Sequence, residues 1–142
     1  MKEEKDVIKA CEVAAKWWSD KLGTAAQNMG KGYDFANLLM GIVSMKNSPN
    51  NEKREKFYEL LKQELIETLK VSNLVMLDTD YGPRGVLASI ARECEIDGYA
   101  FPCKTYMHVR EEKVVVREGY GADEKVIYVK ENTVTDNTEN KI

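Results

Sequence analysis

The fold is decided by the segment KTYMHVREEKVVVREGYGADEKVIYVK, residues 104–130. Along residues 105–110 two sets of side chains alternate, which is typical of a strand that turns one face toward a core. The two sets are Thr105, Met107 and Val109, and Tyr106, His108 and Arg110. Residues 111–113 read as a short turn, so KVVVRE at 113–118 predicts the next antiparallel strand.

Gly119 and Gly121 flank Tyr120 in the next connection. A dinucleotide-binding fingerprint would need a third glycine that opens a helix, but the segment EKVIYVK at 124–130 follows with strand periodicity. We therefore expect a hairpin turn in which the glycines supply positive φ and Tyr120 lies exposed at the tip. In that last strand, strict alternation puts Val126, Tyr128 and Lys130 on one face and Ile127 and Val129 on the other.

Upstream of this segment the apolar residues recur at three- and four-residue steps, which predicts helices. The first covers residues 3–22, the second follows Asp34 as N-cap and runs to Met45, and the third covers residues 52–70. The second is apolar over more than half its circumference, so we expect it to be the most buried. A short apolar run at 74–77 predicts a strand, and a fourth helix follows with Pro83 in its first turn.

This order predicts an α+β fold in which N-terminal helices pack on a small antiparallel C-terminal sheet. We expect a single domain over residues 1–131, because no linker or internal repeat interrupts it. Residues 132–142, rich in amides and threonine, predict a flexible tail.

Composition excludes several classes of function. The chain of 142 residues is 43% hydrophobic and 32% charged, and none of its apolar runs approaches the roughly 20 residues of a membrane span. Its acidic start, MKEEKDVIKACEV, favours a cytoplasmic protein without a membrane partner. A net charge of −3 argues against direct nucleic-acid binding as the main task.

Residues that could carry catalysis are few. Cys11, Cys94 and Cys103 lack the spacing of a zinc site, and His108 is the sole histidine. Asp78 and Asp80 could share a strand face and bind a divalent cation, although such a pair is more often found in turns and caps. We therefore expect a protein without catalytic activity, cofactor or metal site. A small metal-dependent hydrolase is the third alternative, after the two binding functions described below.

Aromatic and basic residues instead gather around the expected tight turns. Rings stack on bases and Lys or Arg binds phosphate, so this mixture suits a nucleotide-sized anion, although protein interfaces favour the same residues. The candidate ligand-binding residues are Phe101, Lys104, Tyr106, His108, Arg110, Arg117 and Tyr120.

The segment from Gly85 to Tyr128 resembles small proteins of Firmicutes phages and prophages. The resemblance rests on a Gly-x-Leu-Ala helix, a Phe-Pro-x-Lys-Thr strand and a Gly-Tyr-Gly-Ala turn before Ile-Tyr. The matching positions are Gly85, Leu87, Ala88, Phe101, Pro102, Lys104, Thr105, Gly119, Tyr120, Gly121, Ala122, Ile127 and Tyr128. The chain departs from the pattern at Cys103, where tryptophan is expected, and at Asp123, where proline is expected.

The resemblance implies a non-catalytic factor that phages use against bacterial immunity. One such mechanism is a sponge that sequesters a cyclic nucleotide or a cyclic ADP-ribose-like signal, bound at a subunit boundary of a homo-oligomer. The alternative is an inhibitor of the anti-CRISPR type, which occludes a host defence protein through the charged face of residues 52–70 or through strand edges.

Overall fold

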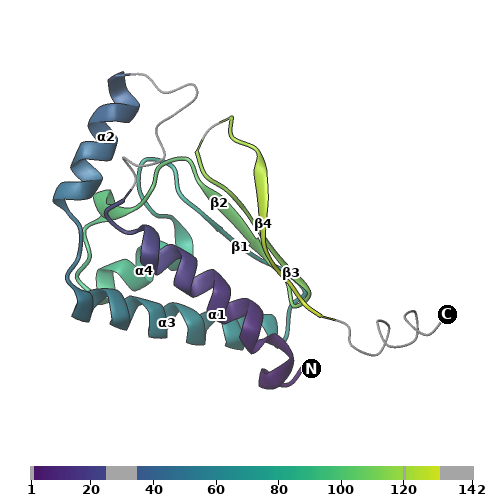
Figure 1. The fold of residues 1–142 in the computed structure, drawn as a ribbon. Helices are drawn as coiled ribbons and strands as arrows, with labels where there is room; N and C mark the ends of the chain where they lie inside the picture. Colours follow the sequence, from purple (N-terminus) through teal and green to yellow (C-terminus); the bar gives the residue numbers. More distant parts are fainter. Residues whose placement is uncertain (1, 25–34, 120, 132–142) are drawn as a thin grey trace.

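The computed structural model describes residues 2–24, 35–119 and 121–131. It has the predicted α+β architecture, with helices first and a four-stranded antiparallel sheet in the C-terminal part (Figure 1). The elements are α1 (Glu4–Lys21), α2 (Phe35–Lys46), α3 (Asn51–Leu69), β1 (Val75–Asp78), α4 (Gly85–Glu93), the 3-10 turn η2 (Gly98–Ala100), β2 (Tyr106–Val109), β3 (Lys113–Arg117) and β4 (Glu124–Val129).

The sheet is a meander in which each strand pairs with the next, in the order β1-β2-β3-β4. The alternation predicted for β2 is confirmed, since Met107 and Val109 are fully buried while Tyr106 and His108 are half-buried on the other face. In β3, Val114 and Val116 are buried in the same way. The face that these residues share is the inner face, which the helices cover.

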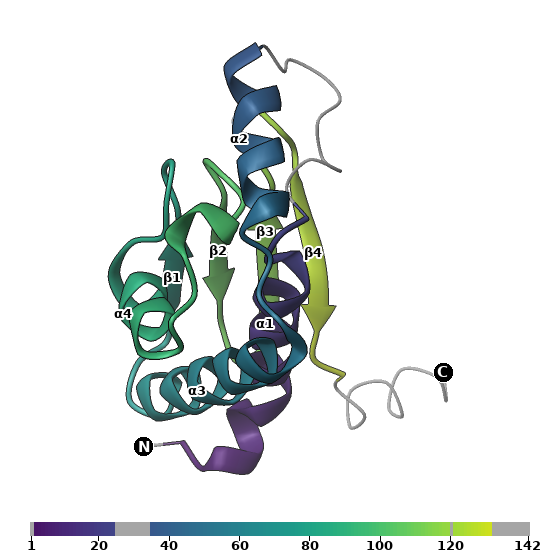
Figure 2. The same ribbon diagram turned by 90° about the vertical axis from the view of Figure 1, so that its left-hand side faces the viewer.

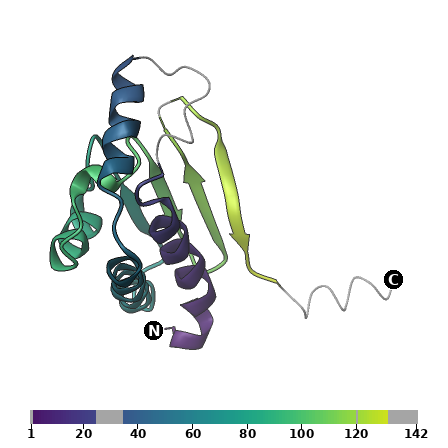
Figure 3. The same cartoon turned by 60° about the vertical axis from the view of Figure 1, so that its left-hand side comes forward.

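Helices α1 and α3 lie together on the inner face, with α4 beside them, and none of the described helices covers the other face of the sheet (Figures 2 and 3). Their apolar stripes meet the sheet in one core that includes Trp18, Phe57, Leu61 and Phe101. Cys94, the residue that follows α4, is also buried in this core. Helix α4 begins at Gly85, two residues after Pro83, which forms a bridge with Thr79 instead of entering the first turn.

Strand β4 departs from strict alternation. Val114 pairs with Tyr128, whereas its neighbour Val115 pairs with Val126, so Ile127 is an extra residue in a β-bulge. Val126 therefore faces away from the core and Tyr128 faces toward it. The expectation that these two residues share a face is wrong, because the bulge shifts the register between them.

The hairpin between β3 and β4 is confirmed, and its glycines adopt positive φ, 93° at Gly119 and 81° at Gly121. The prediction that these two glycines supply positive φ to the turn is therefore confirmed. Tyr120, the N-cap Asp34 and the tail 132–142 lie outside the described residues.

Helix α2 corrects a second expectation. It is not the most buried helix, because Leu39, Ile42 and Met45 are 45%, 41% and 54% exposed.

Within the described part of the chain, no helix is both long and apolar enough to cross a bilayer.

Candidate functional site

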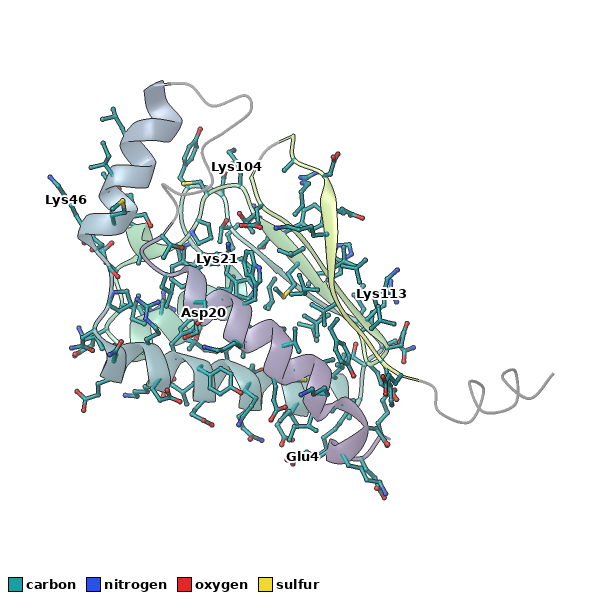
Figure 4. All side chains as sticks on the ribbon, viewed as in Figure 1. Glu4, Asp20, Lys21, Lys46, Lys104 and Lys113 are labelled. Carbon is teal, nitrogen blue, oxygen red and sulfur yellow. The ribbon has the colours of Figure 1, made fainter. Side chains whose placement is uncertain are left out.

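The uncovered face of the sheet, here called the outer face, gathers most of the predicted binding residues. Side chains alternate along β1, β2 and β3, so every second residue of these strands points to this side, and in β4 the bulge shifts the alternation by one residue. Figure 4 shows Lys113 on this side of the sheet, away from the helices. The outer face comprises Met76, Asp78, Tyr106, His108, Lys113, Val115, Arg117, Glu124, Val126 and Val129.

One cross-strand row of the outer face is polar. Asp78 pairs with Tyr106, Tyr106 with Arg117, and Arg117 with Glu124, so the row crosses all four strands. The Arg117 guanidinium lies 4.4 Å from the centre of the Tyr106 ring, and the Tyr106 hydroxyl donates a hydrogen bond to the Glu124 carboxylate. That hydrogen bond raises the pKa of Tyr106, because ionisation would remove its donated proton.

The neighbouring row is largely apolar. It runs through Met76, His108, Val115 and Val126, again across all four strands. Met76 and Val126 are 63% and 54% exposed, which is unusual for large apolar side chains in the middle of strands. The His108 ring stacks on that of Tyr106 with ring centres 5.0 Å apart, which joins the two rows.

A second cluster lies in the loops that follow β1 and precede β2. The Lys104 ammonium forms an ion pair with Asp80 and lies 4.7 Å from the centre of the Tyr81 ring. The Lys104 backbone has a φ of 55°, and its N–H donates to the Asp80 carbonyl at 2.7 Å. Thr79 is buried beneath these loops, where its hydroxyl donates to the Pro102 carbonyl at 2.7 Å.

These contacts place the predicted binding residues in different parts of the protein. Tyr106, His108 and Arg117 meet on the outer face, and Lys104 lies in the loop cluster. Arg110 follows β2 in the turn to β3, where its N–H donates to the Lys113 carbonyl at 2.9 Å.

Phe101 does not belong to the surface. It is 1% exposed, and its ring packs against Phe57 and Trp18 with ring centres 5.7 and 6.4 Å away. The expectation that Phe101 stacks on a ligand is therefore wrong, since the ring completes the core.

The pair of aspartates also has structural partners. Asp80 binds Lys104, and Asp78 lies 3.9 Å from the Arg84 guanidinium. The described residues contain no group of three or more His, Cys, Asp or Glu side chains that could hold a metal ion. Burial, followed by the nearby Asp80 charge, raises the pKa of Cys103, which disfavours a reactive thiolate.

Two residues at or beside the outer face were not predicted from the sequence. Met76 lies in the apolar run at 74–77 that predicted a strand, but β1 is an edge strand and Met76 points to its outer side, 63% exposed. Glu118, beside the glycine turn, is 9% exposed and binds Lys125 at 2.7 Å and Lys21 at 3.0 Å. Burial alone would raise the pKa of Glu118, but the hydrogen bonds from Lys125 and Lys21 outweigh it and lower that pKa.

An open groove of about 530 Å³ lies at a distance from these residues, between α1 and α3. Lys16 and Asp20 line it and form an ion pair at 2.9 Å, and Arg54 beside them is engaged with backbone carbonyls. These three charged side chains of the groove therefore already have partners.

No known protein-family model matches the chain, and no curated protein shows significant similarity to it. The outer face and the loop cluster therefore have to be interpreted from their own geometry.

Proposed function

We propose that the chain is a binding protein without catalytic turnover, which occludes a functional surface of a partner protein through its outer face. The observation that carries this proposal is the combination of exposed Met76 and Val126 with the Tyr106–Arg117 pair on an uncovered sheet. Tyrosine, methionine and arginine are enriched where proteins bind each other.

The shape of the surface supports a macromolecular partner. Four strands about 4.8 Å apart and several residues long give a face of roughly 15 by 20 Å. A specific interface buries about 800 Å² on each partner, so it would extend onto the adjoining loops. Tyr81, 54% exposed beside Lys104, is placed to extend it.

The resemblance to phage proteins supplies the biological setting, an anti-defence factor in a bacterial cytoplasm. The partner on this view is a host defence protein. Asp78 and Glu124 at the two edges of the polar row would meet basic groups of a nucleic-acid channel, as carboxylates do when they stand in place of phosphates.

Sequestration of a nucleotide-type signal is the second candidate function. It is favoured by the half-buried group of Tyr106, His108 and Arg117 on the outer face, which combines rings with a cation. The geometry supports it less well, because the Tyr106 ring already has two partners and Lys104 already binds Asp80. A nucleotide would have to displace these contacts.

Phage titre in bacteria that carry one defined defence system tests the proposal. Expression of the chain should raise the titre at least tenfold, and Met76→Asp/Val126→Asp should abolish the gain. Val71→Asp is the matched control, since Val71 is 71% exposed beyond α3 and off the outer face. No gain against either CRISPR or cyclic-nucleotide defence would refute the anti-defence role.

Calorimetry separates the two candidates. Cyclic di- and trinucleotides and cyclic ADP-ribose isomers should show no binding at micromolar protein if the partner is a protein. Binding that is lost in Tyr106→Ala, with the nucleotide recovered intact, would establish the signal-sequestering function instead.

A further inference from the structure

Helix α2 carries an exposed apolar stripe of its own, separate from the outer face. Leu39, Ile42 and Met45, at successive three-residue steps, are 45%, 41% and 54% exposed. Steps of three residues keep side chains on one side of a helix, so the three form one continuous stripe. Exposed apolar clusters of this kind mark interaction sites.

The opposite side of α2 anchors the helix to the body. Ser44 is 1% exposed, and its hydroxyl donates to the Ala100 carbonyl at 3.0 Å. At 100° per residue, Ser44 lies about 160° around the helix from the centre of the stripe. The stripe therefore lies on the side of α2 opposite its contact with Ala100, and α2 extends past the end of the sheet (Figures 1 and 2).

The composition of α2 narrows the choice of partner. Residues 35–45 contain no charged side chain, and Lys46 is the sole charge of the helix. A helix so poor in charge is ordinarily buried, and it offers nothing that would select a charged partner. An equally apolar helix fits it, and a second copy of the chain supplies one.

We propose that α2 packs antiparallel against α2 of a second copy, about a two-fold axis at Ile42. The stripe is symmetric about Ile42, so the axis places Ile42 against its own equivalent and Leu39 against Met45 of the other copy. Each residue then makes the same contact in both directions, as an isologous interface requires.

Charge and dipole select the antiparallel arrangement over the parallel one. An antiparallel pair puts the two Lys46 ammonium groups at opposite ends, whereas a parallel pair would place them side by side. Figure 4 shows the Lys46 side chain extending away from the protein body. The opposed helix dipoles also attract each other in the antiparallel pair.

The expected affinity is modest. A helix of 12 residues is about 18 Å long, so the pair alone falls short of the roughly 1,000 Å² of a specific interface. Tyr99, 53% exposed on the η2 turn that α2 contacts, is placed to widen it. We expect a dissociation constant of about 1 to 100 µM.

Sedimentation velocity on the full chain tests the proposal over about 1 to 500 µM. The mass should rise from 16.2 kDa toward twice that value, and Ile42→Asp should remain at one chain throughout. Val71→Asp, also exposed but outside α2, should dimerise as the unchanged chain does. Circular dichroism checks that each variant is folded, and a single-chain mass for the unchanged protein at 500 µM overturns the proposal.

A charge swap tests the register. Leu39→Glu and Met45→Lys should each weaken the dimer at least tenfold, and the double variant should recover most of the loss. The antiparallel arrangement brings the two new charges together across the interface, and a parallel one does not. Failure of the double variant to recover overturns the antiparallel register, even if Ile42→Asp proves harmful to folding.

Oxidative crosslinking gives an independent readout in a Cys103→Ser background, since Cys11 and Cys94 are buried. Ile42→Cys should form a disulfide-linked dimer, while Lys46→Cys should not. The reverse pattern overturns the two-fold at Ile42. A dimer that survives Ile42→Asp but is lost in Val126→Asp assigns self-association to the outer face and refutes the proposal. A monomer that floats with neutral lipid vesicles, and no longer does so in Ile42→Asp, also refutes it.

Discussion

Lys21 at the end of α1 forms an ion pair with Glu118 at the end of β3, 3.0 Å away and 97 residues later in the sequence. Lys125 of β4 binds the other carboxylate oxygen at 2.7 Å. One largely buried carboxylate thus joins the helical layer to both strands of the β3–β4 hairpin. This connection fixes where the glycine turn, and with it one end of the outer face, lies relative to the helices.

Glu118→Gln should therefore lower the free energy of unfolding by about 1 to 2 kcal/mol at pH 7, because it removes the charge that both ion pairs, with Lys21 and with Lys125, depend on. The pKa of Glu118 is lowered in the folded protein, so its stabilisation is complete above its unfolded pKa and disappears as pH falls through the folded value. Urea denaturation should show a difference in the free energy of unfolding between Glu118→Gln and the unchanged protein at pH 7, and this difference should disappear near pH 3.

Glu67→Gln is the control for that measurement, since Glu67 forms an exposed ion pair with Lys70 at 3.8 Å. Its effect should stay below about 0.5 kcal/mol. Equal effects of the two substitutions at pH 7 would contradict the structural role of Glu118.

Gly119→Ala should destabilise the hairpin by about 1 kcal/mol, because the residue has a φ of 93° and an added Cβ meets no atom within 4 Å. The cost is conformational, so Gly119→Asn should be milder, since asparagine adopts left-handed backbone more readily. Gly82→Ala, at a position with equal space and no positive φ, should change stability by less than about 0.5 kcal/mol. Thermal unfolding of the three variants measures this order.

Phe101→Ala should cost about 3 to 5 kcal/mol, because it leaves a cavity between Phe57 and Trp18. Tyr99→Ala, two residues away and 53% exposed, should cost less than about 1 kcal/mol. Denaturant titrations compare the two. A folded Phe101→Ala variant that loses only binding would restore the ligand-stacking role that the structure argues against.

The sequence predicts best what depends on local period. The alternation along β2 placed Tyr106 and His108 on one face correctly, because a regular strand keeps its period of two. The same rule failed for Val126 and Tyr128, since the bulge arises from the register with β3. Hydropathy led to the wrong burial for α2. An apolar composition favours burial of a helix but does not show which surface, if any, covers it.

Contacts between distant segments could not be read in advance. Phe101 next to a turn resembled an exposed ring, and its partners Phe57 and Trp18 lie 44 and 83 residues earlier in the sequence. The sequence around Glu118 does not distinguish it from a surface acid beside a hairpin, because Lys21, which pairs with it, comes from α1. Both assignments needed the packing of helices on the sheet.

Arg54 joins the end of α1 to the start of α3. Its guanidinium donates to the carbonyl oxygens of Ser19, Leu22 and Pro49 and to the Ser48 hydroxyl. These carbonyls include groups that the end of α1 leaves without helical partners, so the cation also meets the negative end of the helix dipole. Arg54→Ala should lower the free energy of unfolding by about 2 to 3 kcal/mol, and Arg54→Lys should recover less than half, because an ammonium cannot reproduce the fork of donors. Lys56→Ala, an exposed position on the same helix, should cost less than about 0.5 kcal/mol in the same urea titration. Full recovery by Arg54→Lys would show that charge alone, and not the geometry of the guanidinium, secures the junction.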